Sequence, residues 1–262
     1  MKRVIGRKQS TNNQVWIDTA ARIEELVSRD ELEAATDSAL SEIRTMTAGK
    51  KSAFAWSGGK DSLVIEKMCR DIGIEDSVFV HTNLEYPAFL SWCLENKPEG
   101  CEVINTGQDL DWLCRHPAML FPDKSTVISR WFGIVQRTGI QRYFKAHDLD
   151  IIVVGHRKAD GNFVGRGANI LKNGAGVVRY SPMADWPHEL VLAYIHYHAI
   201  ELPPIYSWKD GYRCGTHPWP SRMGMKSVAD GWADVYAIDP SIVEQAAEKT
   251  DSAALFLEEV RS

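Results

Sequence analysis

The segment Ala55-Trp56-Ser57-Gly58-Gly59-Lys60-Asp61-Ser62-Leu63 joins two different sequence patterns. A short apolar run, 52–56, precedes the two glycines, and apolar residues at helical spacing follow them over 63–69. This order predicts a strand, a glycine-rich turn and a helix. Glycines let backbone N–H groups approach an anion closely, and a helix N-terminus presents further N–H groups and a positive dipole end. The segment therefore predicts an anion-binding turn.

Four side chains of this turn add to the predicted site. Ser57 and Ser62 supply hydroxyl groups, and Lys60 supplies a cation. Asp61 fits a helix cap or a group that holds a metal ion bridging phosphates. The glycine spacing matches neither G-x-x-x-x-G-K-[ST] nor G-x-G-x-x-G. A tight strand–helix turn capped by Asp61, with no ligand, is the alternative interpretation.

Strands and helices alternate along the rest of the chain. The β-rich runs are 77–81, 102–104, 151–155 and 177–180, and helical spacing occurs over 87–96, 110–115, 125–146 and 187–199. This alternation is typical of a mostly parallel sheet covered on both faces. Helical patterns also cover 14–48 and 240–260, whereas 203–232 shows no periodicity. We expect an N-terminal helical extension (1–49), an α/β domain (50–220) and a C-terminal helical tail (221–262).

The composition is that of an ordinary globular protein. The 262 residues are 44% hydrophobic and 25% charged, with a formal net charge of −5, which excludes a disordered or collagen-like chain. No apolar run reaches about 18 residues, so no membrane-spanning helix is expected. The basic N-terminus lacks the apolar segment of a signal peptide. Five irregularly spaced cysteines favour reduced thiols and a cytoplasmic location.

Positive charge gathers in the middle of the chain. Residues 124–179 contain ten Lys or Arg and three Asp. A basic segment in an acidic protein indicates a local anion site; arginines on solvated helix surfaces are the alternative. Within it, Arg130, Ile134, Arg137 and Gln141 lie at the spacing of one helical stripe. That stripe faces either an anion or solvent.

The string SGGKDS after a first strand resembles the PP-loop of the ATP pyrophosphatase superfamily. The resemblance implies a three-layer α/β sandwich of the adenine-nucleotide α-hydrolase-like type. It also implies an enzyme that binds ATP with Mg²⁺, cleaves the bond between the α- and β-phosphates and adenylates an acceptor. Ser57, Gly58, Gly59, Lys60, Asp61 and Ser62 are then nucleotide-binding residues, Lys60 and Asp61 also act in catalysis, and Asp61 contacts Mg²⁺.

Later segments resemble one branch of that superfamily, which holds phosphoadenosine phosphosulfate (PAPS) reductases and the small subunit of bacterial ATP sulfurylase. His81-Thr82-Asn83-Leu84-Glu85-Tyr86-Pro87 is similar to the branch's aspartate-threonine-glycine-x-glutamate-aromatic-proline segment. His81 replaces the usual acid and Asn83 the usual glycine. The resemblance implies nucleotide contacts for His81, Asn83 and Glu85, with Glu85 directed to a metal or ribose. A role of Glu85 beside a helix N-cap stays open.

Gly155-His156-Arg157 and the downstream Arg166 resemble the glycine-x-arginine segment of the same branch and its later arginine. Gly155 is then a nucleotide-binding residue, and Arg157 and Arg166 neutralise phosphate or acceptor charge. A plain surface loop around Arg166 is the alternative. Segments 180–186, 202–206 and 211–213 resemble further elements of the branch, in the expected order.

The chain also departs from the branch. A PAPS reductase uses a nucleophilic cysteine in its C-terminal tail, and here no cysteine follows Cys214. Cys214, with Arg213 and His217 beside it, is the only candidate thiol. No C-x-x-C pair exists, so no Fe–S cluster is expected.

We therefore predict an ATP pyrophosphatase that adenylates an anionic acceptor, in sulfate activation or in nucleotide or nucleic-acid modification. The alternatives are a nucleotide-binding regulatory module without turnover and a reductase using Cys214. The sequence leaves the acceptor, a partner subunit, nucleic-acid binding and the oligomeric state open.

Overall fold

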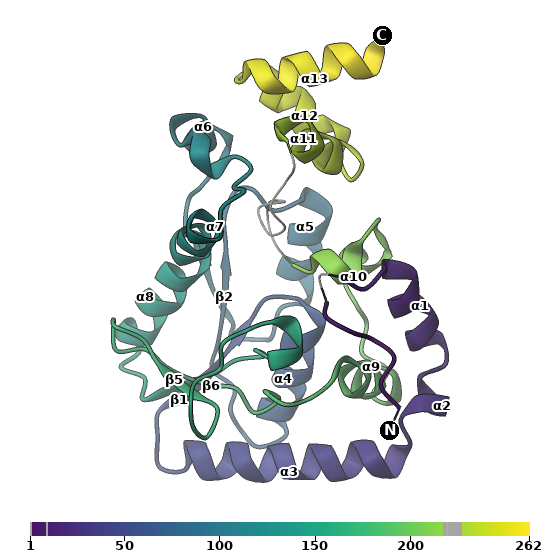
Figure 1. Cartoon of the computed structure of the whole chain (residues 1–262). Coiled ribbons are helices and arrows are strands. Elements are labelled where there is room, and N and C mark those ends of the chain that lie inside the picture. Colours follow the sequence, from purple (N-terminus) through teal and green to yellow (C-terminus); the bar gives the residue numbers. More distant parts are fainter. Residues whose placement is uncertain (1, 9, 217–218, 220–226) are drawn as a thin grey trace.

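A six-stranded sheet forms the centre of the molecule in the computed structural model, which describes residues 2–8, 10–216, 219 and 227–262 (Figure 1). The strand order is β3-β2-β1-β4-β6-β5. All neighbouring strands are parallel except β5, which runs antiparallel to β6. The predicted mostly parallel α/β sheet is therefore confirmed. The strands are β1 (Ser52–Trp56), β2 (Ser77–His81), β3 (Glu102–Asn105), β4 (Ile151–Val153), β5 (Ile170–Lys172) and β6 (Val178–Tyr180).

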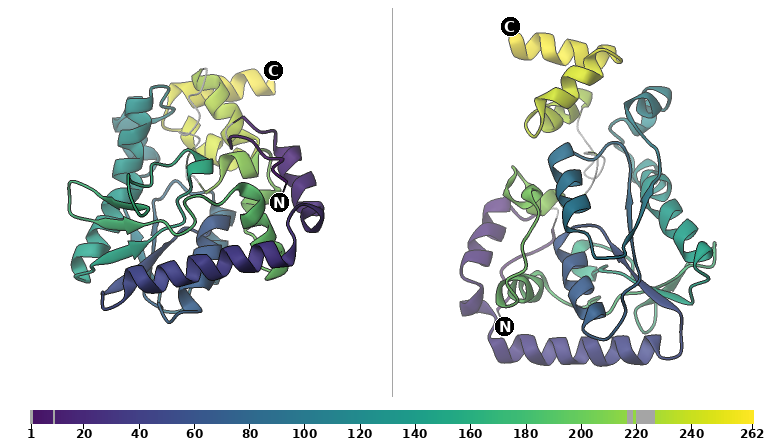
Figure 2. Two further views of the ribbon diagram at one scale, coloured as in Figure 1. Left: turned by 60° about the horizontal axis from the view of Figure 1, so that its bottom comes forward. Right: turned by 180° about the vertical axis from the view of Figure 1, so that it is seen from behind.

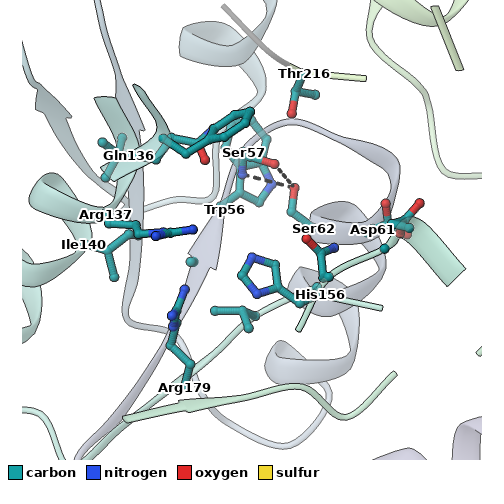
Figure 3. Close-up of a pocket in the computed structure, with 18 of the residues that line it drawn as sticks. Trp56, Ser57, Asp61, Ser62, Gln136, Arg137, Ile140, His156, Arg179 and Thr216 are labelled. Atoms are coloured by element: carbon teal, nitrogen blue, oxygen red, sulfur yellow. Dashed lines mark hydrogen bonds between the residues drawn. The ribbon is translucent and has the colours of Figure 1, made fainter. Parts of the chain in front are cut away.

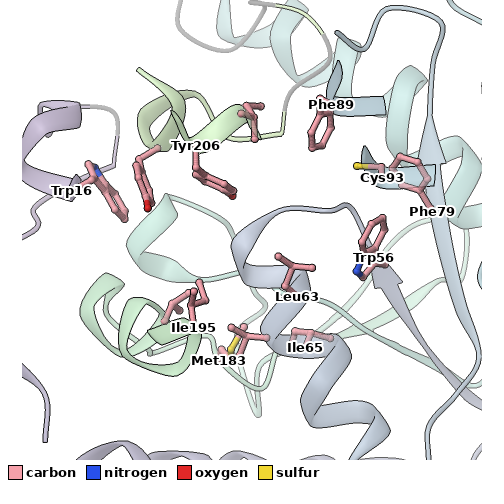
Figure 4. Close-up of a cluster of buried hydrophobic side chains, with 14 of the residues drawn as sticks. Trp16, Trp56, Leu63, Ile65, Phe79, Phe89, Cys93, Met183, Ile195 and Tyr206 are labelled. Carbon is pink, nitrogen blue, oxygen red and sulfur yellow. The ribbon is translucent and has the colours of Figure 1, made fainter. Parts of the chain in front are cut away.

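Helices cover both faces of the sheet because successive strand residues point to opposite sides. Ala53 of β1 packs in a cluster with Tyr143 and Phe144 of α8 (Thr138–Ala146). Phe54, the next residue, belongs to the larger core on the other face. That core contains buried residues of α4 (Lys60–Arg70) and α9 (His188–Tyr197), and Figure 4 shows part of it. The strand ends therefore lie between two helical layers.

Three helices precede the sheet, within the range 14–48 where the sequence shows helical patterns. They are α1 (Asn13–Ala21), α2 (Ile23–Leu26) and α3 (Arg29–Thr47). Ser28 begins α3 with a capping box, in which its Oγ accepts from the N–H of Glu31 and its own N–H donates to the Glu31 carboxylate. Trp16 of α1 is fully buried and stacks on Tyr212, so these helices share the core of the sheet.

The helix predicted over 125–146 is interrupted. α7 (Ser125–Phe132) leads into a π-helical turn (Gly133–Arg137), which continues as α8. A π turn adds one residue to the helical repeat and rotates the following residues relative to those before it. The predicted stripe of Arg130, Ile134, Arg137 and Gln141 is therefore wrong in register.

The C-terminal helices pack on one another beyond the sheet (Figures 1 and 2). α11 (Val228–Tyr236) begins in the stretch without periodicity, and the predicted helix 240–260 is two helices, α12 (Pro240–Ala247) and α13 (Asp251–Arg261). Thr250 separates them by capping α13. The remaining helices include α5 (Pro87–Asn96), α6 (Leu110–Arg115) and α10 (Gly211–Cys214). Among the described residues, no helix combines the length and the apolar character needed to span a bilayer.

Candidate functional site

The glycine turn follows β1 and opens α4, as predicted. Gly58 has a φ of +67°, and a Cβ there would lie 2.5 Å from the sulfur of Cys93. A Cβ on Gly59 would lie 2.8 Å from Cγ2 of Thr216. A side chain at either position would therefore displace the turn or its neighbours.

Hydroxyl groups hold the turn in place. Oγ of Ser62 accepts from the backbone N–H of Ser57 at 3.0 Å and donates to the carbonyl of Gly59 at 2.9 Å. The hydroxyl of Tyr206 accepts from the N–H of Lys60 at 2.8 Å. The N–H groups of Asp61 and Ser62 belong to the first helical turn, which has no intrahelical acceptors for them. They are available to an anion.

A cavity of about 450 Å³ opens beside this turn, at the carboxyl ends of β1 and β4 (Figure 3). Its lining combines the turn, four cationic side chains, one histidine and an apolar wall. The turn contributes Ser57, Asp61 and Ser62, the cations are Lys8, Arg137, Arg179 and Arg213, the histidine is His156, and the apolar wall includes Ala55, Val80, Ile140, Val154 and Val177. This size and mixture suit a small charged ligand with a flat apolar part.

Gly155 lines the cavity and brings two elements together. A Cβ on Gly155 would lie 3.0 Å from the backbone carbonyl carbon and oxygen of Asp61. Only glycine therefore lets the chain after β4 approach the first turn of α4 this closely.

Arg157 is completely buried next to the cavity. Its Nε lies 2.7 Å from Oδ1 of Asp61, and its Nη2 lies 2.8 Å from Oδ2 of Asp160. It also donates to the carbonyl of Trp186 at 3.1 Å and to Nδ1 of His188 at 3.1 Å. Arg157 is absent from the cavity lining. The structure places it as a support for Asp61 and the turn.

Lys60 is also buried, with 1% of its side chain exposed. Its Nζ lies 2.6 Å from Oδ2 of Asp61 and 5.6 Å from the centre of the Trp16 ring. Although burial raises the pKa of Asp61, the charges of Arg157 and Lys60 hold it well below its ordinary value. Lys60 does not line the cavity, so its predicted contact with phosphate stays a prediction.

The fit of Mg²⁺ can be judged from the same carboxylate. Both oxygens of Asp61 already face cations, Arg157 and Lys60. Among residues 2–8, 10–216, 219 and 227–262, no group of three or more His, Cys, Asp or Glu side chains is placed to hold a metal ion. Asp61 as a Mg²⁺ ligand stays a prediction.

His81, Asn83 and Glu85 do not reach the cavity lining. The Nδ1 of His81 lies 2.7 Å from the carbonyl oxygen of Thr82 in a buried position. Asn83 is exposed and accepts from Asn105 at 2.6 Å. Glu85 accepts from the N–H of Thr82 at 2.9 Å and from its hydroxyl at 2.7 Å. These bonds shape the loop after β2, and the nucleotide contacts of the three residues stay predictions.

Arg166 is exposed and also lies outside the lining. It belongs to the loop between Gly161 and β5, of which Gly161 and Asn162 do line the cavity. Its predicted catalytic role is not tested by this geometry. Cys214 lies at the end of α10, where Arg213 and Thr216 line the cavity and Cys214 does not. His217 lies outside the described residues.

Lys8 lines the cavity, although no sequence pattern selects it. The N-terminal segment 2–8 crosses to α9, where the buried carboxylate of Glu189 accepts from the N–H groups of Val4 and Ile5, both at 2.7 Å. This anchor brings Lys8 to the cavity, close enough that a Cβ on Gly215 would lie 2.8 Å from its Nζ. Burial and the charge of Lys60 lower the pKa of Lys8.

Comparison with known proteins assigns the family. Residues 51–216, more than half of the chain, match the model of the phosphoadenosine phosphosulfate reductase domain. The chain belongs to this family. The match covers the turn, Gly155, Arg157 and Arg213, whereas Lys8 precedes the PAPS reductase domain. No curated protein sequence matches the chain.

Three solved structures are similar to the chain, and the first of them shows the fold. The PAPS reductase of Candida auris, solved as a phosphate complex, has a TM-score of 0.50 at 16% identity, over 69% of this chain and 92% of that one. The U34-tRNA thiolase NcsA of Methanococcus maripaludis, with a [4Fe-4S] cluster, has a TM-score of 0.43 at 17% identity, over 97% of this chain and 84% of that one. The NH3-dependent NAD synthetase of Campylobacter jejuni has a TM-score of 0.44 at 11% identity, over 87% of this chain and 92% of that one. The expected adenine-nucleotide α-hydrolase-like fold is confirmed.

Proposed function

We propose that this PAPS reductase-family protein is an enzyme that binds ATP in the cavity, cleaves it between the α- and β-phosphates and transfers the adenylyl group to an acceptor. One observation carries the proposal. The cavity begins at a helix N-terminus, whose first N–H groups have no intrahelical acceptor, continues along an apolar wall and is lined by four cationic side chains. A ligand with a flat apolar base and several negative charges matches that arrangement.

The phosphates belong at the turn. The N–H groups of Asp61 and Ser62 and the positive end of α4 favour negative charge there. Lys8 is the cation that approaches this end of the cavity, since it lies near Lys60, Asp61 and Asp160. Asp61 faces the phosphates as part of a buried ion cluster, so its own negative charge is compensated by Arg157 and Lys60.

The base belongs on the apolar wall. Val80, Val154 and Val177 present branched side chains to the cavity, and Ile140 adds a fourth from α8. Flat rings pack favourably on such surfaces because both lose apolar contact with water. This places the ribose and the α-phosphate between the wall and the turn.

The transfer needs few groups of the protein. An acceptor oxygen forms a bond to the α-phosphorus, and the bond from that phosphorus to the bridging oxygen breaks. Pyrophosphate leaves with the electron pair, and the N–H groups of the turn and Lys8 stabilise its charge. An acceptor that is already an anion gives up no proton, so the step requires no general base.

Two kinds of acceptor fit the family, a small oxyanion such as sulfate and a group on nucleic acid. The basic segment 124–179 supports an anionic acceptor of either kind. A reductase using Cys214 is the alternative reaction, and nucleotide binding without turnover is the alternative role.

Pyrophosphate release tests the proposal. The protein is incubated with ATP and Mg²⁺ and with sulfate, carboxylates or tRNA in turn, and ³¹P NMR follows pyrophosphate and new adenylylated products. Ser62→Ala removes the hydroxyl that holds the turn and should weaken ATP binding at least about 10-fold. Ser91→Ala, on the exposed side of α5, is the control.

Three results contradict the proposal. ATP binding that is equal in wild type and Ser62→Ala removes the turn from the site. ATP binding without pyrophosphate release, with every acceptor, supports the regulatory module. Thiol-dependent release of sulfite from PAPS that disappears in Cys214→Ser supports the reductase.

A further inference from the structure

Two arginines and a histidine of the cavity lie away from the glycine turn. Arg137 belongs to the π-helical turn, Arg179 to β6, and His156 follows β4. Figure 3 shows Arg137 and Arg179 directed into the cavity, with His156 between them and Ser62. Phosphates bound at the turn leave this group without a function.

The two guanidinium groups are uncompensated. Among the described residues, neither Arg137 nor Arg179 forms an ion pair or a side-chain hydrogen bond, and Nε of Arg179 is buried without a partner. The carboxylates in the lining, Asp61 and Asp160, both pair with Arg157. Burial and the nearby charge of Arg137 lower the pKa of Arg179. Like charges held together in this way are favourable only when an anion lies between them.

The backbone supports the same interpretation. The π turn, Gly133–Arg137, rotates the helix so that Gln136, Arg137 and Ile140 line the cavity. A π turn is rare and is frequently found at functional sites. Here its effect is to bring Arg137 into the cavity together with Arg179.

We propose that Arg137 and Arg179, with His156 beside them, bind the terminal oxyanion of the acceptor, a carboxylate, sulfate or phosphate group. The assignment of this oxyanion to the acceptor rests on the proposed function. Planar guanidinium groups match the paired oxygens of an oxyanion, and neutral His156 can donate an N–H to a third oxygen. Because Arg179 is half-buried and its Nε is covered, a terminal group that enters the cavity fits better than a nucleic-acid backbone that runs along a surface.

This subsite also explains how the reaction proceeds without a base. One oxygen of the bound oxyanion attacks the α-phosphorus, the α–β bridging bond breaks, and pyrophosphate takes the electron pair. No proton moves, so His156 keeps the same protonation state throughout. Arg137 and Arg179 orient the acceptor at the side of the cavity away from the leaving group.

The titration of His156 reports on the subsite. Burial first, and then the charges of Arg179 and Arg137, lower the pKa of His156 to about 4, against the raising effect of Asp160 and Asp61. An oxyanion bound between the arginines cancels much of their charge, so it should raise this pKa by about one unit. NMR of the imidazole ring in the full chain measures the pKa with sulfate, phosphate or acetate added in turn, without nucleotide.

The variants Arg137→Gln and Arg179→Gln should weaken binding of the effective oxyanion at least about 10-fold. Both should also raise the pKa of His156 in its absence. Arg130→Gln is the matched control, because Arg130 is exposed on α7 and outside the lining. The oxyanion that shifts His156 at the lowest concentration identifies the acceptor class.

The inference is overturned if none of the three oxyanions shifts His156, or if only a single-stranded oligonucleotide does. Titration calorimetry with ATP separates this result from the proposed function. ATP binding without any oxyanion effect refutes the subsite alone. An oxyanion effect that both arginine variants remove, in a protein that binds no ATP, supports the subsite and refutes the proposed function.

Discussion

Nε of Arg157 lies 2.7 Å from Oδ1 of Asp61, and the arginine side chain is completely buried. The contact joins the segment after β4 to the first turn of α4. It fixes the position of the helix N-terminus that borders the cavity. Arg157 therefore links Asp61 of α4 to Asp160, in the segment after β4.

Replacement of Arg157 should destabilise the fold. Arg157→Ala leaves Asp61 and Asp160 buried with fewer cations, which typically costs about 3–5 kcal/mol. Urea denaturation gives the free energy of unfolding. Arg166→Ala, at an exposed arginine of the following loop, should change it by less than about 0.5 kcal/mol. Similar losses in the two variants would contradict the structural role of Arg157.

Gly155→Ala should weaken nucleotide binding more than an alanine does at a glycine with open space around it. The added Cβ lies 3.0 Å from the backbone of Asp61 and pushes the first turn of α4 away from the cavity. We expect at least about a 10-fold loss of ATP affinity in calorimetry. Gly174→Ala is the control, since a Cβ at Gly174 meets nothing within 4 Å. Equal affinities in both variants would show that the approach of Gly155 to Asp61 is unimportant.

Lys8→Gln should reduce ATP affinity by about 10- to 150-fold, the effect of one charge-assisted contact. Lys2→Gln changes an exposed lysine on the same segment and should leave the affinity unchanged. Burial and Lys60 lower the pKa of Lys8 below its ordinary value of 10.5, so the wild type should lose affinity as the pH rises through that lowered pKa. A Lys8→Gln protein with the same pH profile would exclude Lys8 from the phosphate site.

His188 should make the fold sensitive to acid. Burial, Arg157 and Lys60 lower its pKa to about 3, and Asp160 and Asp61 oppose the shift. The unfolded chain binds a proton below pH 6.5 and the folded chain does not, so stability falls as the pH falls from 6.5 towards 3. At pH 5 the loss is about 2 kcal/mol. Denaturation at pH 7 and pH 5 should show a loss of stability about 2 kcal/mol smaller in His188→Gln than in His196→Gln, at an exposed histidine, because the contribution of His156 is common to both variants.

Local sequence patterns were sufficient for the turn and for five of the six strands, whereas the three residues of β5 were not predicted. Gly58, Gly59 and the strands around them depend on neighbours close in sequence, so their prediction was accurate. Gly155 approaches the turn because parallel strands end at the same edge of a sheet, and its predicted nucleotide contact stays a prediction. The resemblance to the superfamily followed from the same segment, and the resemblance to the PAPS reductase branch followed from later segments such as 81–87 and 155–157.

Contacts between segments that are distant in the sequence could not be predicted from local sequence patterns. Lys8 reaches the cavity only because Glu189 anchors the N-terminal segment. Arg157 follows a strand as predicted, but the carboxylates of Asp61 and Asp160 turn it away from the cavity. The sequence spacing places Arg137 on a helical stripe. The π turn that changes the neighbours of Arg137 has no recognised sequence signal.

The hydrogen bonds of the N-terminal segment to Glu189 affect the order in which the cavity forms during synthesis. The backbone of Val4 and the side chain of Glu189 are separated by 185 positions, and contacts of such long sequence separation form slowly. During synthesis the glycine turn leaves the ribosome well before α9 does, so a growing chain holds the turn while Lys8 is still unattached. Lys8 therefore reaches the cavity only after the residues of α9 have emerged and folded.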